Sequence, residues 1–216
     1  MVKLSLIIEG GAPGYNLSAD TASNSEALRE SLHKFFRKFL NRDDIDIKLF
    51  IGYGYRNAAK QFINEKGKIS LFVDSDFPPS ETDSWFEKLI NKEHPEKSIV
   101  IPDDKKEYIF FMIQEMEAWF LKQPSCLEKW AEKEGYTKTD STNIVDHSLL
   151  RNKNIEEIKK PSSKLKDIMK HFFEKGKKKA KYSKLKTAPS LLDELDVNEL
   201  KILDKELKRF YSSINN

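Results

Sequence analysis

Two carboxylates one residue apart, Asp74 and Asp76, follow the apolar run "ISLFV" at 69–73. Side chains two apart along a strand point the same way, so both carboxylates would project together from the strand's carboxyl end. Open α/β sheets bind ligands at that edge, and two like charges so close raise each other's pKa unless a cation lies between them. The stretch therefore indicates a metal. The alternative is that Asp, Ser and Pro only end the strand and cap a helix over 81–91.

A third carboxylate, Glu9, ends the apolar run "VKLSLII" at 2–8 and precedes two glycines. If the strands are parallel, Glu9 lies at the same edge of the sheet as the two aspartates. Mg²⁺ and Mn²⁺ favour carboxylate oxygens, and a bound metal generates a nucleophile by lowering the pKa of its water. We therefore predict Glu9 to be a metal ligand or a general base. The alternative is a loop glutamate that caps the next element.

Apolar runs alternate with amphipathic helices through the first half of the chain. This alternation predicts an α/β fold with a mostly parallel, four-stranded sheet flanked by helices over residues 1–122. The expected strands are 2–8, 46–51, 69–73 and 98–101, and the expected helices are 25–40, 57–64 and 81–91. Residues 123–216 show no convincing strand and predict a helical extension packed on this core. Its expected helices are 125–134, 163–174, 187–194 and 196–213.

Composition limits the class of protein. A single cysteine, Cys126, excludes an internal disulfide framework and a cysteine-based zinc site. The first apolar run is too short for a secretory signal, and no segment approaches the length of a membrane span, so we expect a cytoplasmic protein that does not bind a membrane. The four histidines lack ligand spacing and are assigned no chemistry. They are His33, His94, His147 and His171.

The pairing of "LIIEGG" with "LFVDSD" on an alternating α/β core resembles the Toprim domain of topoisomerases, primases and OLD-type nucleases. Two further stretches, "FMIQEMEAWFLKQP" at 111–124 and "YSKLKTAPSLLDELDV" at 182–197, are similar to small bacterial Toprim-like proteins. Those proteins resemble RloB-type and OLD-associated nucleases and often accompany an ABC-type ATPase in phage defence. In the Toprim family the glutamate and the two aspartates carry magnesium and the phosphotransfer chemistry.

The resemblance implies a magnesium-dependent nuclease for DNA or RNA, the effector subunit of an ATPase-linked phage-defence system. It also implies Glu117 as a further metal ligand and Lys186 as the catalytic lysine that reaches the scissile phosphate. One alternative is a non-catalytic sensor or scaffold subunit that binds a partner ATPase. Another is a different Asp-x-Asp metal enzyme, either a phosphatase with Asp74 as nucleophile or a glycosyltransferase.

Two basic features suit a phosphodiester substrate. Arg56 follows the loop "GYGY" at the start of a helix, where backbone N–H groups and a guanidinium fork favour phosphate. Five lysines near the end of the chain are placed to follow a nucleic-acid backbone: Lys177, Lys178, Lys179, Lys181 and Lys184. The alternatives are an arginine in solvent beside a tight turn, and a solvated lysine-rich face.

Overall fold

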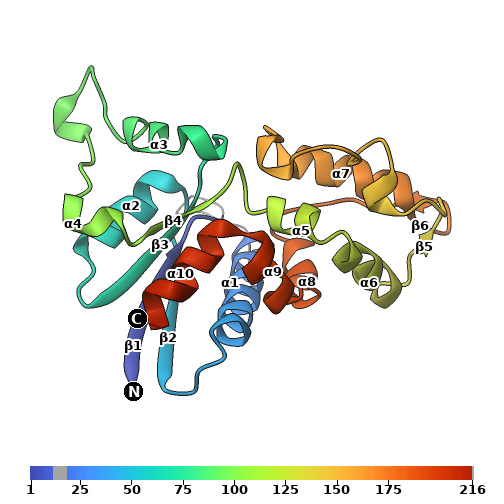
Figure 1. Cartoon of the computed structure of the whole chain (residues 1–216), viewed down its shortest axis with the longest axis horizontal. Helices are drawn as coiled ribbons and strands as arrows, with labels where there is room; N and C mark the ends of the chain where they lie inside the picture. Colours follow the sequence, from blue (N-terminus) through green and yellow to red (C-terminus); the bar gives the residue numbers. More distant parts are fainter. Residues whose placement is uncertain (12–18, 216) are drawn as a thin grey trace.

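The computed structural model describes residues 1–11 and 19–215, with the backbone alone for Ala19 and Asp20. Its main sheet has four parallel strands in the order β2-β1-β3-β4 (Figure 1). These strands are β1 (Val2–Ile8), β2 (Ile45–Ile51), β3 (Lys68–Asp74) and β4 (Ile109–Met112). The predicted parallel sheet is confirmed. Strands β1 and β3 are direct neighbours, with Ile8 opposite Phe72, so their carboxyl ends meet.

Helices cover both faces of the sheet, which explains why the inner strand β3 is a nearly continuous apolar run, whereas the edge strand β2 alternates buried and exposed residues. On one face α1 (Ala19–Leu40) packs beside α10 (Lys205–Asn215), and the other face carries α2 (Tyr55–Asn64) (Figure 1). Residues of β1 alternate accordingly, because Leu6 and Ile8 join one apolar cluster while Ile7 joins the other. The ring of Phe210 lies 5.0 Å from that of Phe72, so the last helix closes the core of the first strands.

The expected strand at 98–101 is wrong, and the fourth strand is instead β4. Ile99 and Ile101 are buried and Val100 is 72% exposed, so the segment alternates as a strand would. Its buried side chains pack in the cluster around Trp85, however, and no strand pairs with it among the described residues. The alternating pattern correctly indicates a half-buried extended segment, but it does not show whether a neighbouring strand pairs with it.

The segment between β3 and β4 also differs from the single helix expected over 81–91. It contains only short turns of helix, separated by irregular backbone. They are η1 (Pro79–Glu81), α3 (Ser84–Glu87), η2 (Pro95–Lys97) and α4 (Asp103–Lys106).

The second half of the chain is helical where the pattern predicted helices, with one break. Its helices are α5 (Ala118–Lys122), α6 (Ser125–Lys133), α7 (Pro161–Phe172), α8 (Ala188–Asp193), α9 (Val197–Leu203) and α10, with short turns η3 (Ile144–Asp146) and η4 (Ile155–Glu157). The expected helix 196–213 divides at Asp204, whose buried carboxylate accepts from Leu207 N–H at 2.9 Å and pairs with Lys122 at 2.8 Å. A buried acid that caps a new helix ends the preceding one.

A second, small antiparallel sheet contradicts the expectation of a strandless second half. It contains β5 (Thr137–Lys138), β6 (Phe173–Lys175) and β7 (Lys178–Lys179). These strands have only two or three residues each, too few to show a periodicity of two in the sequence. In the described part of the chain, no helix has the length and apolar character needed to cross a bilayer.

Candidate metal centre

Glu9 and Asp74 meet at the carboxyl edge of the sheet because β1 and β3 are adjacent and parallel. The Glu9 N–H donates to Phe72 O at 2.7 Å, which continues the ladder one residue past β1. The Asp74 N–H donates to Glu9 Oε2 at 3.2 Å. The structure thus brings together the first two acids that the sequence predicted to share an edge.

Each oxygen of the buried Asp74 carboxylate accepts from one donor. Its Oδ1 accepts from the Met116 N–H at 2.8 Å, and its Oδ2 accepts from Lys184 Nζ at 2.7 Å. The first donor comes from the loop after β4 and the second from the region before α8, so three distant parts of the chain converge on one side chain.

Asp76 does not follow the strand alternation that the sequence predicted. Its φ of 57° lies in the left-handed region, and its N–H donates to Gln114 O at 2.9 Å. The exposed carboxylate pairs with Lys88. No choice of one oxygen each from Glu9, Asp74 and Asp76 places all three within 4.8 Å of one another. Asp76 must therefore leave Lys88 before the three acids can share one cation.

Glu117 adds a fourth carboxylate to this centre. It is buried, and its Oε1 accepts from the Tyr182 hydroxyl at 2.7 Å. Its Oε2 is buried without a hydrogen-bond partner and lies 4.0 Å from Lys184 Nζ. A buried carboxylate oxygen without a donor is unfavourable, and a proton or a bound cation would stabilise it.

The lysine of the centre is Lys184, which the sequence placed among the backbone-binding lysines, and not Lys186. Lys186 is exposed, whereas Lys184 contacts both Asp74 and Glu117. Sequence reasoning also missed Tyr182, which precedes Lys184 by two residues in the stretch already singled out. The spacing Tyr-x-Lys at the start of the quoted stretch 182–197 was the available signal.

The electrostatics of the centre follow from burial. Burial, reinforced by Asp74, raises the pKa of Glu9 from 4.5 to about 7. Burial also raises the pKa of Glu117, opposed by Lys184 and reinforced by Asp74. Burial alone would lower the pKa of Lys184, but Asp74 and Glu117 outweigh it and raise that pKa. Four carboxylates face two ammonium groups, Lys184 and Lys88, so full ionisation leaves an excess of two negative charges.

Residues 21–215 match a family described as a domain of unknown function, DUF4276. The chain belongs to this family. The match covers both aspartates, Glu117 and Lys184, and it begins after Glu9. No curated protein and no solved structure matches the chain.

In this DUF4276 chain, Arg56 is occupied by backbone carbonyls. Its guanidinium donates to Lys88 O at 3.3 Å, to Leu89 O at 3.1 Å and to Lys97 O. It therefore fixes the segment that carries Lys88, whose ammonium pairs with Asp76. The arrangement gives Arg56 a structural role in place of the predicted contact with phosphate.

The other predicted lysines lie on the surface around the β6–β7 hairpin. Lys177, Lys178, Lys179 and Lys181 are all exposed. Lys179 pairs with Glu174 at 3.0 Å, across the hairpin. The exposed lysines precede Lys184 by three to seven residues, so they lie close along the chain to the residue that contacts Asp74.

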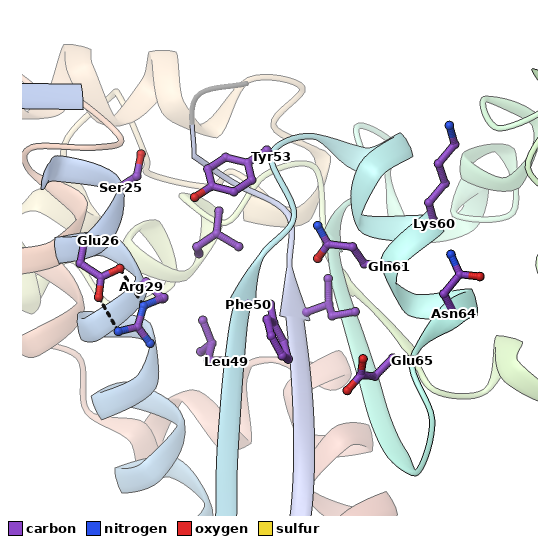
Figure 2. A pocket seen from close by; sticks show the side chains of 12 residues that line it. Ser25, Glu26, Arg29, Leu49, Phe50, Tyr53, Lys60, Gln61, Asn64 and Glu65 are labelled. Carbon is purple, nitrogen blue, oxygen red and sulfur yellow. Dashed lines mark hydrogen bonds and ion pairs between the residues drawn. The ribbon is translucent and has the colours of Figure 1, made fainter. Parts of the chain in front are cut away.

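A separate hollow of about 590 Å³ lies over β2, between α1 and α2 (Figure 2). Figure 2 shows Glu26 and Arg29 of α1 paired with each other beside it, while Lys60 and Asn64 extend from α2. None of the four carboxylates of the metal centre lines this hollow. Glu26 and Arg29 neutralise each other, and the described residues that line the hollow include no cluster of carboxylates like that of the metal centre.

Proposed function

We propose that this chain is a metal-dependent phosphodiester hydrolase that cleaves DNA or RNA in the cytoplasm. The observation that carries the proposal is that Asp74 and Glu117 both lie beside Lys184, while Glu9 accepts from the Asp74 N–H, at the carboxyl edge of a parallel sheet. Such edges are where α/β sheets bind ligands, and clustered titratable groups with perturbed pKa values are typical of active sites.

The chemistry of the donors fits Mg²⁺ or Mn²⁺. All four side chains offer oxygen, which hard cations prefer, and the excess of negative charge matches a dication. The unpartnered Glu117 Oε2 gives the cation a ligand that no protein group now satisfies. Glu9, Asp74 and Glu117 would hold it after their side chains move, because no choice of one oxygen from each now places all three within 4.8 Å of one another. Asp76 would join after release from Lys88. Once bound, the metal would polarise a phosphoryl oxygen and lower the pKa of a water.

The chain's own residues supply the remaining roles. In the metal-free centre Glu9 has a pKa of about 7, and if other carboxylates held the metal it would take a proton from the attacking water near neutral pH. Lys184, already charged beside Asp74, would turn to an oxygen of the scissile phosphate. Tyr182 orients Glu117 through its 2.7 Å hydrogen bond. The exposed lysines from 177 to 181 would follow the nucleic-acid backbone, with an affinity that falls as salt rises.

We further propose that an ABC- or OLD-type ATPase partner gates the activity. The Toprim-like motifs support this partner, and the chain has no G-x-x-x-x-G-K-[ST] loop with which to bind a nucleotide by that route. Co-purification with the ATPase, and cleavage only when both are present, would support gating. Robust Mg²⁺-dependent cleavage by the lone chain at nanomolar concentration would refute it.

The test is cleavage of labelled DNA and tRNA with Mg²⁺ or Mn²⁺, with and without the ATPase. Asp74→Asn/Asp76→Asn should lower the rate by at least about 100-fold, the scale on which positioned acid–base groups act. The matched control is Asp103→Asn/Asp104→Asn, which removes two neighbouring carboxylates from exposed α4. Equal cleavage by both double variants would refute the assignment. No cleavage by any combination would favour the sensor or scaffold alternative.

A further inference from the structure

Three potential metal ligands converge outside the carboxylate centre. Asp140 and His147 belong to the segment that follows β5, and His171 lies in the last turn of α7. One donor atom from each of the three side chains lies within 4.8 Å of the other two. Among the described residues, no other three histidine, cysteine or acidic side chains place their ligand atoms this close together. His147 and His171 lack ligand spacing along the sequence, which assigned them no chemistry, but the fold brings them together.

We propose that Asp140, His147 and His171 form a binding site for a first-row transition-metal dication such as Zn²⁺. Two imidazoles and one carboxylate suit zinc, whereas Mg²⁺ prefers oxygen alone. Zinc bonds to nitrogen and oxygen are about 2.0–2.2 Å long, so two ligands of one ion lie at most about 4.4 Å apart. The observed cluster is already close to that size.

The contacts within the cluster show which bonds the metal replaces. His171 Nε2 and Asp140 Oδ2 lie 2.8 Å apart, within hydrogen-bonding distance. The rings of His147 and His171 lie 4.4 Å apart, inclined by 30°. His147 Nδ1 accepts only a long, 3.3 Å bond from the Leu149 N–H. A metal at this site would take the place of the hydrogen bond between His171 and Asp140.

The hydrogen-bonded His171–Asp140 pair alone does not account for the third side chain. An ion pair between His171 and Asp140 would need only those two groups, yet the ring of His147 also packs against the ring of His171. A hollow lined by Asp167, Lys170 and Lys179 adjoins the cluster, which leaves room for water as a fourth ligand. Asp167 lies four residues before His171, on the same face of α7, and adds a further carboxylate to this hollow.

A metal here would join two segments that already touch. Thr139 donates through its hydroxyl to His171 O at 2.9 Å and through its N–H to Phe172 O at 2.8 Å. The ion would fasten the segment from 139 to 149 onto the end of α7. Since such binding stabilises only the folded state, zinc should raise the melting temperature.

The experiment is zinc titration by calorimetry of the full chain, purified without a histidine tag, in buffer that contains MgCl₂. The wild type should bind one Zn²⁺ at this site. His147→Asn and His171→Asn should each weaken binding by at least about 10-fold. The matched control is His94→Asn, which removes an exposed histidine 3.4 Å from Glu96 and should leave binding unchanged. Circular dichroism of each variant without metal checks its fold.

Co²⁺ provides a second readout, because coordination by histidine gives d–d absorption bands that mere loss of a surface ion pair would not move. The bands should appear in the wild type and in Asp74→Asn/Asp76→Asn, and they should change in His147→Asn. This outcome does not depend on nuclease activity. Zinc binding that persists unchanged in both histidine variants would overturn the proposal, as would no wild-type binding at a Kd below about 10 µM.

Discussion

Glu9→Gln should stabilise the fold at pH 8 while it removes a ligand of the proposed metal centre. Burial and Asp74 raise the pKa of Glu9 from 4.5 to about 7, so the folded state holds a proton that the unfolded state has lost between those pH values. The stability linked to this group is complete below about pH 4.5 and is lost as pH rises through about 7. Glutamine never ionises, and its carbonyl oxygen can still accept from the Asp74 N–H.

The magnitude follows from that difference in pKa. Each pKa unit corresponds to about 1.4 kcal/mol, so the ionised Glu9 costs the wild type up to about 3 kcal/mol at pH 8. For a chain of this length, such a gain shifts the melting temperature by up to about 6–12 °C. Below pH 4.5 the two proteins should have the same stability, because the glutamate is then neutral in both states.

Urea titrations of wild type and Glu9→Gln at half-unit steps from pH 4.5 to 8.5, without divalent metal, measure this difference. The exposed Glu93 provides the control, since Glu93→Gln should track the wild type throughout. A Glu9→Gln variant that is no more stable than the wild type at pH 8 would refute the reasoning. So would a stability difference that stays constant across the pH range.

Three further perturbations test the centre and its surroundings. Mg²⁺ or Mn²⁺ should raise the calorimetric melting temperature of the wild type but not of Asp74→Asn/Asp76→Asn, and an equal rise in both would mean that these acids bind no metal. Lys184→Met should lower the free energy of unfolding in urea by about 3 kcal/mol at pH 7. This is the lower end for a broken buried pair, because the Lys184 side chain is 31% exposed. Lys186→Met should change the free energy of unfolding by less than about 0.5 kcal/mol, and equal losses in the two variants would contradict the placement of Lys184. Arg56→Leu should cost about 2 kcal/mol in the same assay, through its lost bonds to carbonyls, and leave the salt dependence of DNA binding unchanged, whereas a shallower salt slope would show contact with phosphate.

The sheet could be predicted because β1 and β3 are apolar runs and β2 alternates apolar and charged residues, so each shows a strand pattern in the sequence. The meeting of Glu9 with Asp74 followed from parallel connections alone. The turn at Asp76 could not be predicted, since its left-handed backbone depends on a bond to Gln114 O from another loop. Its carboxylate consequently pairs with Lys88, twelve residues later, and does not project alongside the carboxylate of Asp74.

Other roles depend on contacts that no local pattern encodes. Lys184 and Lys186 stand two residues apart, and only tertiary placement decides which one reaches Asp74. The glycine loop before Arg56 predicts a phosphate ligand. The carbonyl acceptors of Arg56 lie more than thirty residues away along the chain, so no local pattern indicates them. His147 and His171 meet only because the segment after β5 returns to the end of α7.

Anomalous diffraction from crystals soaked in MnCl₂ tests the central claim most directly, because it locates the metal relative to each carboxylate. The account predicts a manganese peak within about 2.0–2.6 Å of oxygens of Glu9 and Asp74, with Lys184 displaced from Asp74. A map with no peak at this edge of the sheet, and with Lys184 and Lys88 still paired to the two aspartates, would contradict it.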